Sequence, residues 1–348
     1  MDHLNIISKK KPNYPVNSKL RNYLFEFLRE EQLPLEYEDL ARFQNSFPLL
    51  DPDGNDTLWH SVGYAPQDNL EVYRGLLEIY VKLTSSGTLA AMDHLSVDRI
   101  DYCLFGNSNP FRIKIINLVN DNYDYYYIKK ADASRVYGLE LEHILSPNKI
   151  NYLIHGHTLV EEHIFGIPGD VFINHTIHTE KHNLVRLSKE FVKFNERSFV
   201  RLLGDMRDYN YVIDMTPDFD QIQYRIRAID FDQESYEGNI KMYRLQYFKE
   251  NAKFVTLSLK YISPESVNQY RIEERSLMAK RLLLSQYQYK KLIRIMADDT
   301  LSTPVKTNEL REGLNGYHKT TKFSKCQSMG ALVNMNISIS LNIPLSQL

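Results

Sequence analysis

Two short segments of this chain carry acidic and amide side chains at a spacing that suits metal-assisted phosphoryl transfer. Asp205 comes five residues before Asn210, directly after a stretch with the periodicity of an amphipathic helix. Asp230 follows an apolar, strand-like run. Such a reaction needs oxygen ligands for Mg²⁺ and an acceptor for the proton of a hydroxyl. The three residues therefore indicate transfer of a phosphoryl group to a hydroxyl.

A strand is predicted over residues 123–130, which are rich in aromatic side chains and end in two lysines. Successive side chains of a strand point to opposite faces, so the two lysines cannot both point into one site. In such a site an apolar residue directly before the lysine is expected, which favours Lys129 as the lysine that points into the site. Alternation with Ile128 as the inward residue favours Lys130 instead. We prefer Lys129 and keep Lys130 as the alternative.

A short helix is predicted next, over residues 134–145. Glu140 shares a helical face with Val136 and Ile144, so its side chain is expected to point inward. Glu142 is the alternative acidic residue of this helix.

The elements that follow lead to the acidic segments. Residues 158–169 indicate a strand that runs into a Gly-Ile-Pro-Gly turn, and residues 183–202 indicate the helix that precedes Asp205. A strand at 212–213, a polar excursion and a returning strand at 224–229 then lead to Asp230.

The remaining segments are predicted with less connection to these residues. The sequence indicates two helices within 18–46, a loop-like stretch over 47–63, a helix over 69–83, strands over 100–105 and 111–119, helices over 236–298 with a break at 263–264, and a short helix near 307–314. Residues 328–341 alternate apolar and polar types, and we assign no element to them.

The composition limits the class of protein. The chain has 348 residues, enough for two or more domains, and its hydrophobic content of 43% and charged content of 25% are ordinary for a soluble globular protein. The net charge of −2 creates no general attraction to nucleic acid or to an anionic membrane. Residues 1–12 lack the apolar core of a signal peptide, and no apolar run reaches the ~18–20 residues of a spanning helix.

The two cysteines, Cys103 and Cys326, lie far apart in sequence, so a disulfide framework is not expected and a reducing compartment is. We therefore expect a cytoplasmic protein without a nucleic-acid or membrane partner. No obligate protein partner is evident.

The acidic segments resemble two motifs of the protein-kinase-like superfamily. That superfamily has an H-R-D-x-x-x-x-N catalytic loop and a D-F-G metal segment. This chain looks closest to the aminoglycoside-phosphotransferase-like branch, which has H-G-D-x-x-x-x-N and I-D-F, whereas the chain has L-G-D-M-R-D-Y-N over 203–210 and I-D-F over 229–231. The predicted elements over about residues 97–236 follow the order of the superfamily. They are the strand with the lysines, the helix with the glutamates, the strand over 158–169 as the hinge strand, the long helix, the loop of Asp205 and the Asp-Phe segment.

The resemblance implies an α+β, two-lobe protein-kinase-like fold. A helical segment over 1–95 would precede a small antiparallel-sheet lobe with the hinge over 96–168. A helical large lobe, with the catalytic loop and the C-terminal tail, would occupy 169–348.

The resemblance also implies roles for residues of the large lobe. Asp205 would accept the proton of the substrate hydroxyl, and Arg207 would neutralise the transferring phosphate. Asn210 and Asp230 would bind Mg²⁺.

In the small lobe, Lys129 or Lys130 would bind the phosphates of ATP, and Glu140 would orient the lysine. The backbone around Glu162 would meet the adenine. The chain would then be an ATP- and Mg²⁺-dependent phosphotransferase acting on a hydroxyl of a small molecule or a protein.

Three positions depart from the pattern of the superfamily. Leu203 replaces the histidine of the motif, Asp232 stands at the glycine of D-F-G, and the loop over 106–111 has only one glycine. Leu203 and the loop with one glycine favour an alternative, a pseudokinase-type nucleotide-binding or scaffold protein without catalysis.

Overall fold

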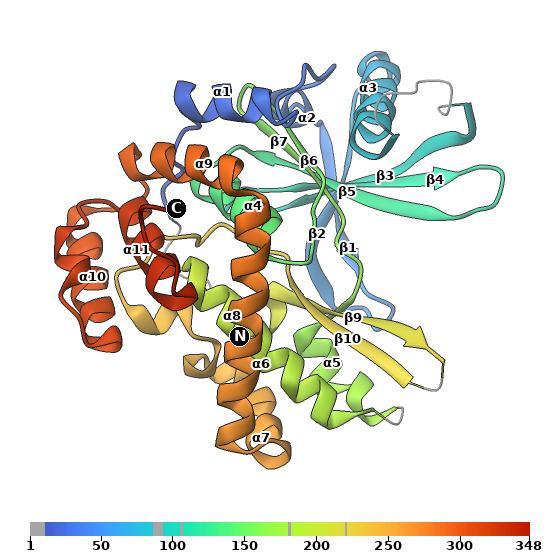
Figure 1. Cartoon of the computed structure of the whole chain (residues 1–348). Helices are drawn as coiled ribbons and strands as arrows, with labels where there is room; N and C mark the ends of the chain where they lie inside the picture. The colour runs from blue at the N-terminus through green and yellow to red at the C-terminus, as the bar shows by residue number, and fades with distance from the viewer. Residues whose placement is uncertain (1–10, 86–92, 105–106, 180–181, 220) are drawn as a thin grey trace. The chain divides into compact units, whose positions relative to one another are not determined.

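A computed structural model of the chain describes residues 11–85, 93–104, 107–179, 182–219 and 221–348. Backbone contacts divide the chain into two compact units. The first consists of Met1–Ala133 and Ile150–His163, and the second of Ser134–Lys149 and Ile164–Leu348. A large sheet forms the first unit, and the second is mainly helical (Figure 1).

The first unit is built on an antiparallel sheet of seven described strands in the order β1-β2-β3-β4-β5-β7-β6. Its strands are β1 (Asn45–Leu50), β2 (Asp56–Gly63), β3 (Leu95–Cys103), β4 (Phe111–Asn117), β5 (Tyr123–Lys130), β6 (Tyr152–His155) and β7 (Thr158–Glu162). Its helices are α1 (Ser18–Glu26), α2 (Tyr37–Leu40) and α3 (Pro66–Ser85). The predicted lysine strand is β5, and the predicted hinge strand, β7, is its neighbour in the sheet.

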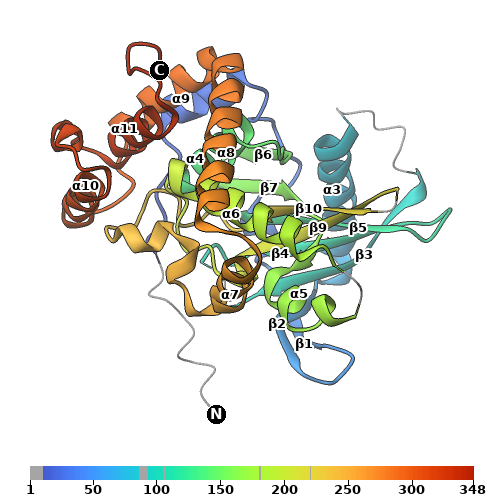
Figure 2. The same cartoon turned by 60° about the horizontal axis from the view of Figure 1, so that its bottom comes forward.

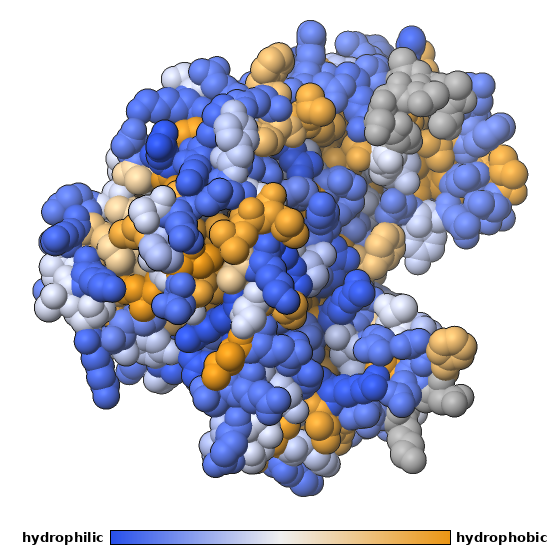
Figure 3. All heavy atoms as spheres, viewed as in Figure 1, coloured by the Kyte–Doolittle hydropathy of each residue, from blue (hydrophilic) through white to orange (hydrophobic). Residues whose placement is uncertain are grey.

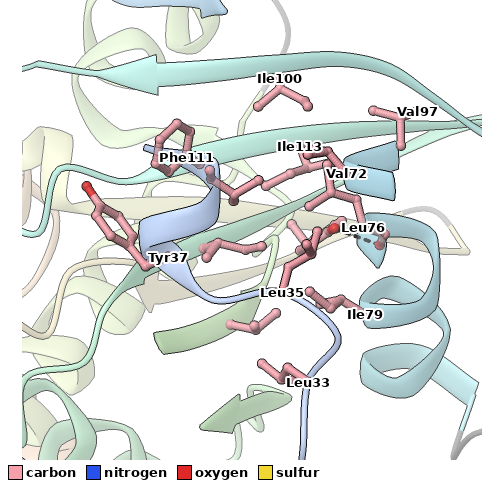
Figure 4. Close-up of a cluster of buried hydrophobic side chains, with 14 of the residues drawn as sticks. Leu33, Leu35, Tyr37, Val72, Leu76, Ile79, Val97, Ile100, Phe111 and Ile113 are labelled. Carbon is pink, nitrogen blue, oxygen red and sulfur yellow. Dashed lines mark hydrogen bonds between the residues drawn. The ribbon is translucent and has the colours of Figure 1, made fainter. Parts of the chain in front are cut away.

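The core of this unit lies between α3 and the sheet (Figure 4). Val72, Leu76 and Ile79 follow one face of α3 at helical spacing, and all three are buried. They face buried residues of β3 and β4, among them Ile100 and Ile113. This apolar contact holds α3 against the strands that precede the lysine strand.

The predicted loop over 47–63 is wrong, because most of it forms the β1–β2 hairpin. Most of β1 is exposed, so its sequence lacks the alternation of apolar and polar residues that marks a half-buried strand. Pro48 is tolerated because β1 is an edge strand. The turn between the strands is closed by Asp51, whose carboxylate accepts hydrogen bonds from the backbone N–H groups of Asp53 and Asn55.

The second unit contains eight described α-helices and a small sheet in the order β10-β9-β8. The helices are α4 (Ala133–Leu145), α5 (Gly169–Asn174), α6 (Leu184–Arg201), α7 (Ala252–Tyr261), α8 (Pro264–Leu284), α9 (Gln286–Asp298), α10 (Pro304–His318) and α11 (Met329–Leu341). The strands are β8 (Ile167–Pro168), β9 (Tyr211–Asp218) and β10 (Gln221–Ala228). Short 3₁₀ helices are η3 (Thr176–His178), η4 (Asp208–Asn210), η5 (Ile240–Tyr243), η6 (Leu245–Tyr247), η7 (Lys249–Asn251) and η8 (Lys322–Lys325).

Helix α6 is the centre of this unit and packs against α7, α8, α11 and β10 (Figure 2). Asn183 caps its N-terminus by accepting a hydrogen bond from the backbone N–H of Arg186. The helix ends where Leu202 adopts a left-handed conformation with φ of 61°. The position of α6 therefore fixes where the chain enters the segment of Asp205.

Two predictions for the C-terminal half need correction or extension. Residues 236–251 contain only short 3₁₀ helices, so the helices predicted from residue 236 begin at Ala252. The short helix predicted near 307–314 is part of the longer α10, and the unassigned residues 328–341 are largely α11. Buried side chains lie all around α11, Asn336 and Ser340 among them, so its sequence shows no apolar stripe with a helical period.

The α+β class is confirmed, with an antiparallel-sheet unit and a mainly helical region as the resemblance implied. The predicted boundaries at 95 and 168 stay a prediction. The structure places the first 95 residues in the same unit as the sheet, to which β1 and β2 belong.

Charged and polar side chains predominate on the face shown in Figure 3, and apolar ones gather near α8 and α11. Leu283 and Leu284, at the end of α8, are exposed. None of the described helices combines the length and the apolar character that crossing a bilayer requires.

The contact between α9 and α11 predicts opposite effects for two glycine-to-alanine changes. A Cβ at Gly330 would lie 2.2 Å from the carbonyl oxygen of Met296, whereas a Cβ at Gly316 would meet nothing within 4 Å. We expect Gly330→Ala to lower the free energy of unfolding by about 1–3 kcal/mol through overpacking. Gly316→Ala should raise it by up to about 1 kcal/mol, because alanine is the better helix former. Urea unfolding followed by circular dichroism measures both, and equal values for the two variants would contradict the close packing of α11.

Candidate active site

The segment after α6 lies beside the segment that follows Asp230. Leu203, which is fully buried, forms an antiparallel bridge with Glu234. The backbone N–H of Gly204 donates to the carbonyl of Gln233 at 3.2 Å, and the N–H of Ser235 donates to the carbonyl of Leu202 at 2.9 Å. The position that carries histidine in the related motif is therefore tied to the Asp-Phe segment through its backbone.

The same two segments are joined again at the base of the β9–β10 hairpin. Tyr211 pairs with Ala228, and the backbone N–H of Ile229 donates to the carbonyl of Asn210 at 3.1 Å. The residues between these two connections include the predicted Asp205 and Asp230. The structure thus brings the three residues of the predicted catalytic and metal set into one region of the second unit.

Asn210 closes the loop that contains Asp205. Its Nδ2 donates to the backbone carbonyl of Asp205 at 2.7 Å, and the N–H of Arg207 donates to the same carbonyl at 2.8 Å. In the part of the chain that the structure describes, no group donates to Oδ1 of Asn210. The amide oxygen therefore remains able to bind a metal ion, as predicted for this residue.

Asp205 has an unusual backbone conformation and a paired side chain. Its φ of 57° lies in the left-handed region, which few residues other than glycine adopt. Its N–H donates to the carbonyl of Met242 at 3.0 Å, which supports this conformation. Oδ1 accepts from Nε of Arg207 at 2.8 Å, and Nη1 of Arg207 also binds Glu250 at 2.9 Å.

Burial raises the pKa of Asp205, while the ion pair with Arg207 opposes that shift. The effect of burial is the larger one, so the pKa of Asp205 lies above that of an exposed aspartate. A carboxylate with a raised pKa is a better proton acceptor near neutral pH. The predicted contact of Arg207 with a phosphate stays a prediction, since the contact observed is with Asp205 itself.

Asp230 is bound by an arginine that the sequence analysis did not single out. Nη1 of Arg135 lies 3.0 Å from Oδ1 of Asp230 and 2.9 Å from Oδ1 of Asp232, and its Nη2 donates to the carbonyl of Ile229 at 3.2 Å. The backbone N–H of Asp232 donates to Oδ1 of Asp230 at 2.9 Å. Arg135 is buried in the first turn of α4. A charged residue in a mainly apolar helix was the feature of the sequence that could have indicated a buried ion pair here.

The two lysines of β5 differ in their environment within the first unit. Lys129 is buried, and its Nζ lies 2.7 Å from Oε2 of Glu161 on β7. Lys130 is exposed, and its Nζ lies over the ring of Tyr37 at 5.2 Å from the centroid. Burial and the ion pair favour Lys129 as the functional lysine. The pairing of Lys129 with Glu161 was not predicted from the sequence.

The predicted acidic residues of α4 have partners within the second unit. Oε2 of Glu140 accepts from Nε2 of Gln288 at 2.9 Å, and Oε2 of Glu142 lies 2.5 Å from Nη1 of Arg201. The pairing of Lys129 with Glu140 stays a prediction.

Glu162, at the end of β7, binds Asn151 in two ways. Its N–H donates to the carbonyl of Asn151 at 3.0 Å, and its Oε2 accepts from Nδ2 at 2.9 Å. The predicted contact of this part of the chain with adenine stays a prediction. Gly106, in the predicted phosphate loop, lies outside the described residues.

Further acids surround the loop of Asp205. Asp208 is buried, and its pKa is raised to about 6 by burial and then by the neighbouring charges of Asp170 and Glu250. Negative charge thus accumulates around Arg207, which is a reason for its close ion pairs.

Comparison with known proteins gives no family. No family model matches this chain, and no curated protein matches it. Among solved structures, the autoinhibited serine kinase domain of the giant muscle protein titin is similar over 65% of this chain and 88% of that chain, with 14% sequence identity and a TM-score of 0.27. A structure of titin kinase and its flanking domains is similar over 66% of this chain and 51% of that chain, with 14% identity and a TM-score of 0.25. Because both TM-scores are low, neither likeness supports an argument.

The bridge partner Glu234 makes the stability of this region dependent on pH. Its side chain is fully buried, and its Oε2 has no hydrogen-bond partner among the described residues. Burial raises its pKa to about 8, although Arg201 opposes the shift. The folded protein therefore binds this proton more tightly than the unfolded chain, whose glutamate has a pKa of about 4.3.

We expect Glu234→Gln to remove this dependence. In the wild type, the contribution of Glu234 to stability is complete below about pH 4 and is lost as the pH rises through about 8. The variant should gain stability over the wild type between pH 5 and 8, by on the order of 1 kcal/mol per pH unit. Melting temperatures across this range test it, with Glu312→Gln at an exposed position of α10 as the control. A difference that does not change with pH would show that Glu234 is ionised throughout.

Proposed function

We propose that this chain is a kinase-like phosphotransferase that moves a phosphoryl group from ATP to a hydroxyl with the help of Mg²⁺. The main support is the pairing of the two acidic segments. Backbone hydrogen bonds hold 202–204 against 233–235 and Asn210 against Ile229, so that Asp205, Asn210 and Asp230 lie in one region. Little covalent chemistry is asked of the protein in such reactions, and positioning supplies most of the rate.

The residues fit a magnesium–nucleotide complex in part. Mg²⁺ is commonly held by one or two protein oxygens together with phosphate oxygens and water. Oδ1 of Asn210 and the carboxylate of Asp230 would supply the protein oxygens. Arg135 binds the same carboxylate, so the guanidinium and the Mg²⁺ ion would have to share Asp230. When bound, the ion would neutralise charge on the phosphates.

Asp205 would orient the acceptor hydroxyl and take its proton. Burial favours this role, and the ion pair with Arg207 weakens it, because a guanidinium stabilises the carboxylate. We infer that Arg207 fixes the direction of the carboxylate in the absence of an acceptor. In the first unit, Lys129 would reach the phosphates.

The second candidate function is nucleotide binding without catalysis. Its specific support is that each of the two key carboxylates already has an arginine partner, Arg207 for Asp205 and Arg135 for Asp230. A scaffold would keep such pairs for stability alone.

Nucleotide binding is tested by thermal stability. A ligand that binds only the native state stabilises it by mass action, so ATP with Mg²⁺ should raise the melting temperature. Asp230→Ala should remove the part of the shift that depends on magnesium. Asp214→Ala, at an acidic position of β9, is the matched control and should keep it. A wild-type protein that shows no shift at millimolar ATP would remove the nucleotide from both candidate functions.

Catalysis is tested at Asp205. Asparagine keeps the shape of the side chain and tolerates the left-handed backbone, so Asp205→Asn should fold and bind ATP as the wild type does. Phosphoryl transfer, including slow hydrolysis of ATP by water, should fall by about 10²- to 10⁴-fold, the usual contribution of a general base. Release of phosphate measures the rate, with Asp214→Asn as the control. Equal turnover by wild type and Asp205→Asn, with normal ATP binding, would favour the second candidate.

A further inference from the structure

A pocket of about 190 Å³ lies within the second unit, among α6, α7, α8, α10 and the segment 244–246. Its walls are largely apolar. Helix α6 contributes Phe191 and Phe199, and helices α7 and α8 contribute Leu259 and Val267. This pocket is smaller than the ~300–1,000 Å³ typical of sites for drug-sized ligands, so its occupant must be small.

One end of the pocket is polar and positively charged. Glu196 is buried there, and both of its oxygens are bound: Oε2 by Nε of Arg271 at 2.6 Å and Oε1 by Nε of Arg275 at 2.5 Å. Arg244 lines the same end and contacts the ring of Tyr317, at 5.1 Å from the centroid. Across the part of the chain that the structure describes, no carboxylate forms an ion pair with Arg244. Two guanidinium groups of the lining, Arg244 and Arg271, therefore oppose the one carboxylate of Glu196, and the excess charge favours an anion.

Ser258 supplies an unused hydrogen-bonding group in the wall of the pocket. The residue is only 8% exposed, and among described groups its Oγ has no hydrogen-bond partner. A buried hydroxyl without a partner is costly, and native structures usually satisfy it with water or a ligand. Ser258 and Arg244 both line the pocket.

This pocket is separate from the candidate active site. Asp205, Arg207, Asn210 and Asp230 do not belong to its lining. Its occupant therefore does not have to be a nucleotide or a phosphoryl acceptor.

We propose that this pocket binds a small carboxylate with an apolar body, such as a single aromatic ring. Arg244 pairs with the carboxylate, and Phe191 and Phe199 contact the ring. Guanidinium groups pair well with carboxylates, since the N–H donors match the two oxygens. A ring against apolar walls gains from removal of its surface from water.

The probes for this proposal are phenylacetate and its neutral counterpart phenylacetamide, added to the full-length protein. Calorimetric titration and thermal melts measure binding. We expect phenylacetate to bind at millimolar concentration or better and to raise the melting temperature. Phenylacetamide should bind at least about tenfold more weakly, because it cannot form the charge-assisted pair with Arg244.

Two variants locate the binding site. Arg244→Gln should lower the affinity for phenylacetate by about tenfold or more and leave phenylacetamide unchanged. Arg294→Gln, at an exposed position of α9, is the matched control. Ser258→Leu fills the pocket and should abolish binding of both probes, so this variant decides the question if Arg244→Gln does not fold. Saturation with ATP and Mg²⁺ should not displace phenylacetate.

Four outcomes would overturn the proposal. They are equal binding of acid and amide, unchanged affinity in both pocket variants, displacement of phenylacetate by ATP, and absence of any binding. In the last case water alone satisfies Ser258.

Discussion

The candidate site depends on backbone pairing between residues 202–204 and 233–235. This pairing is close because Gly204 has no side chain: a Cβ there would lie 3.0 Å from the carbonyl oxygen of Gln233. The β9–β10 hairpin fixes the other end of the same two segments through its register, with Tyr211 opposite Ala228. A slip of one residue in this register would turn every side chain to the opposite face. The direction of Asp230 relative to Asn210 is therefore set by hydrogen bonds of the backbone rather than by contacts of the two side chains.

Charge compensation is the second constraint on this region. Asp205, Asp208, Asp170 and Glu250 are acids whose charges influence one another, and Arg207 bridges two of them. Removing one partner of a buried ion pair leaves a charge without compensation, which is more costly than the pair is stabilising. A metal ion or an incoming hydroxyl at this place would thus compete with Arg207 for the carboxylates. The rate of such a site would depend on how easily Arg207 releases Asp205.

Much of the fold could be predicted because its elements have strong local signals. Strand β5 and helices α3, α4 and α6 have the expected apolar patterns. The β1–β2 hairpin and α11 were not recognised. The first is too exposed, and the second too buried on all sides, for a periodic pattern to form. For the site, local motifs indicated Asp205, Arg207, Asn210 and Asp230, but not Arg135, the arginine partner of Asp230. Arg135 lies 95 residues before Asp230 in the chain, and no local pattern specifies a contact of that range.

Helix α4 shows that order along the chain does not decide which unit an element joins. It follows β5 and precedes β6, two strands of the first unit, yet it belongs to the second. Its polar side chains explain this, because Arg135 binds Asp230, Tyr137 donates to Asp299, and Glu142 pairs with Arg201. Each of these groups is buried or partly buried and would lose a partner if α4 left the helical unit. The helix that the resemblance assigns to the lysine is thus held in the unit that contains the acids. Its first turn, through Arg135, also places a positive charge beside Asp230.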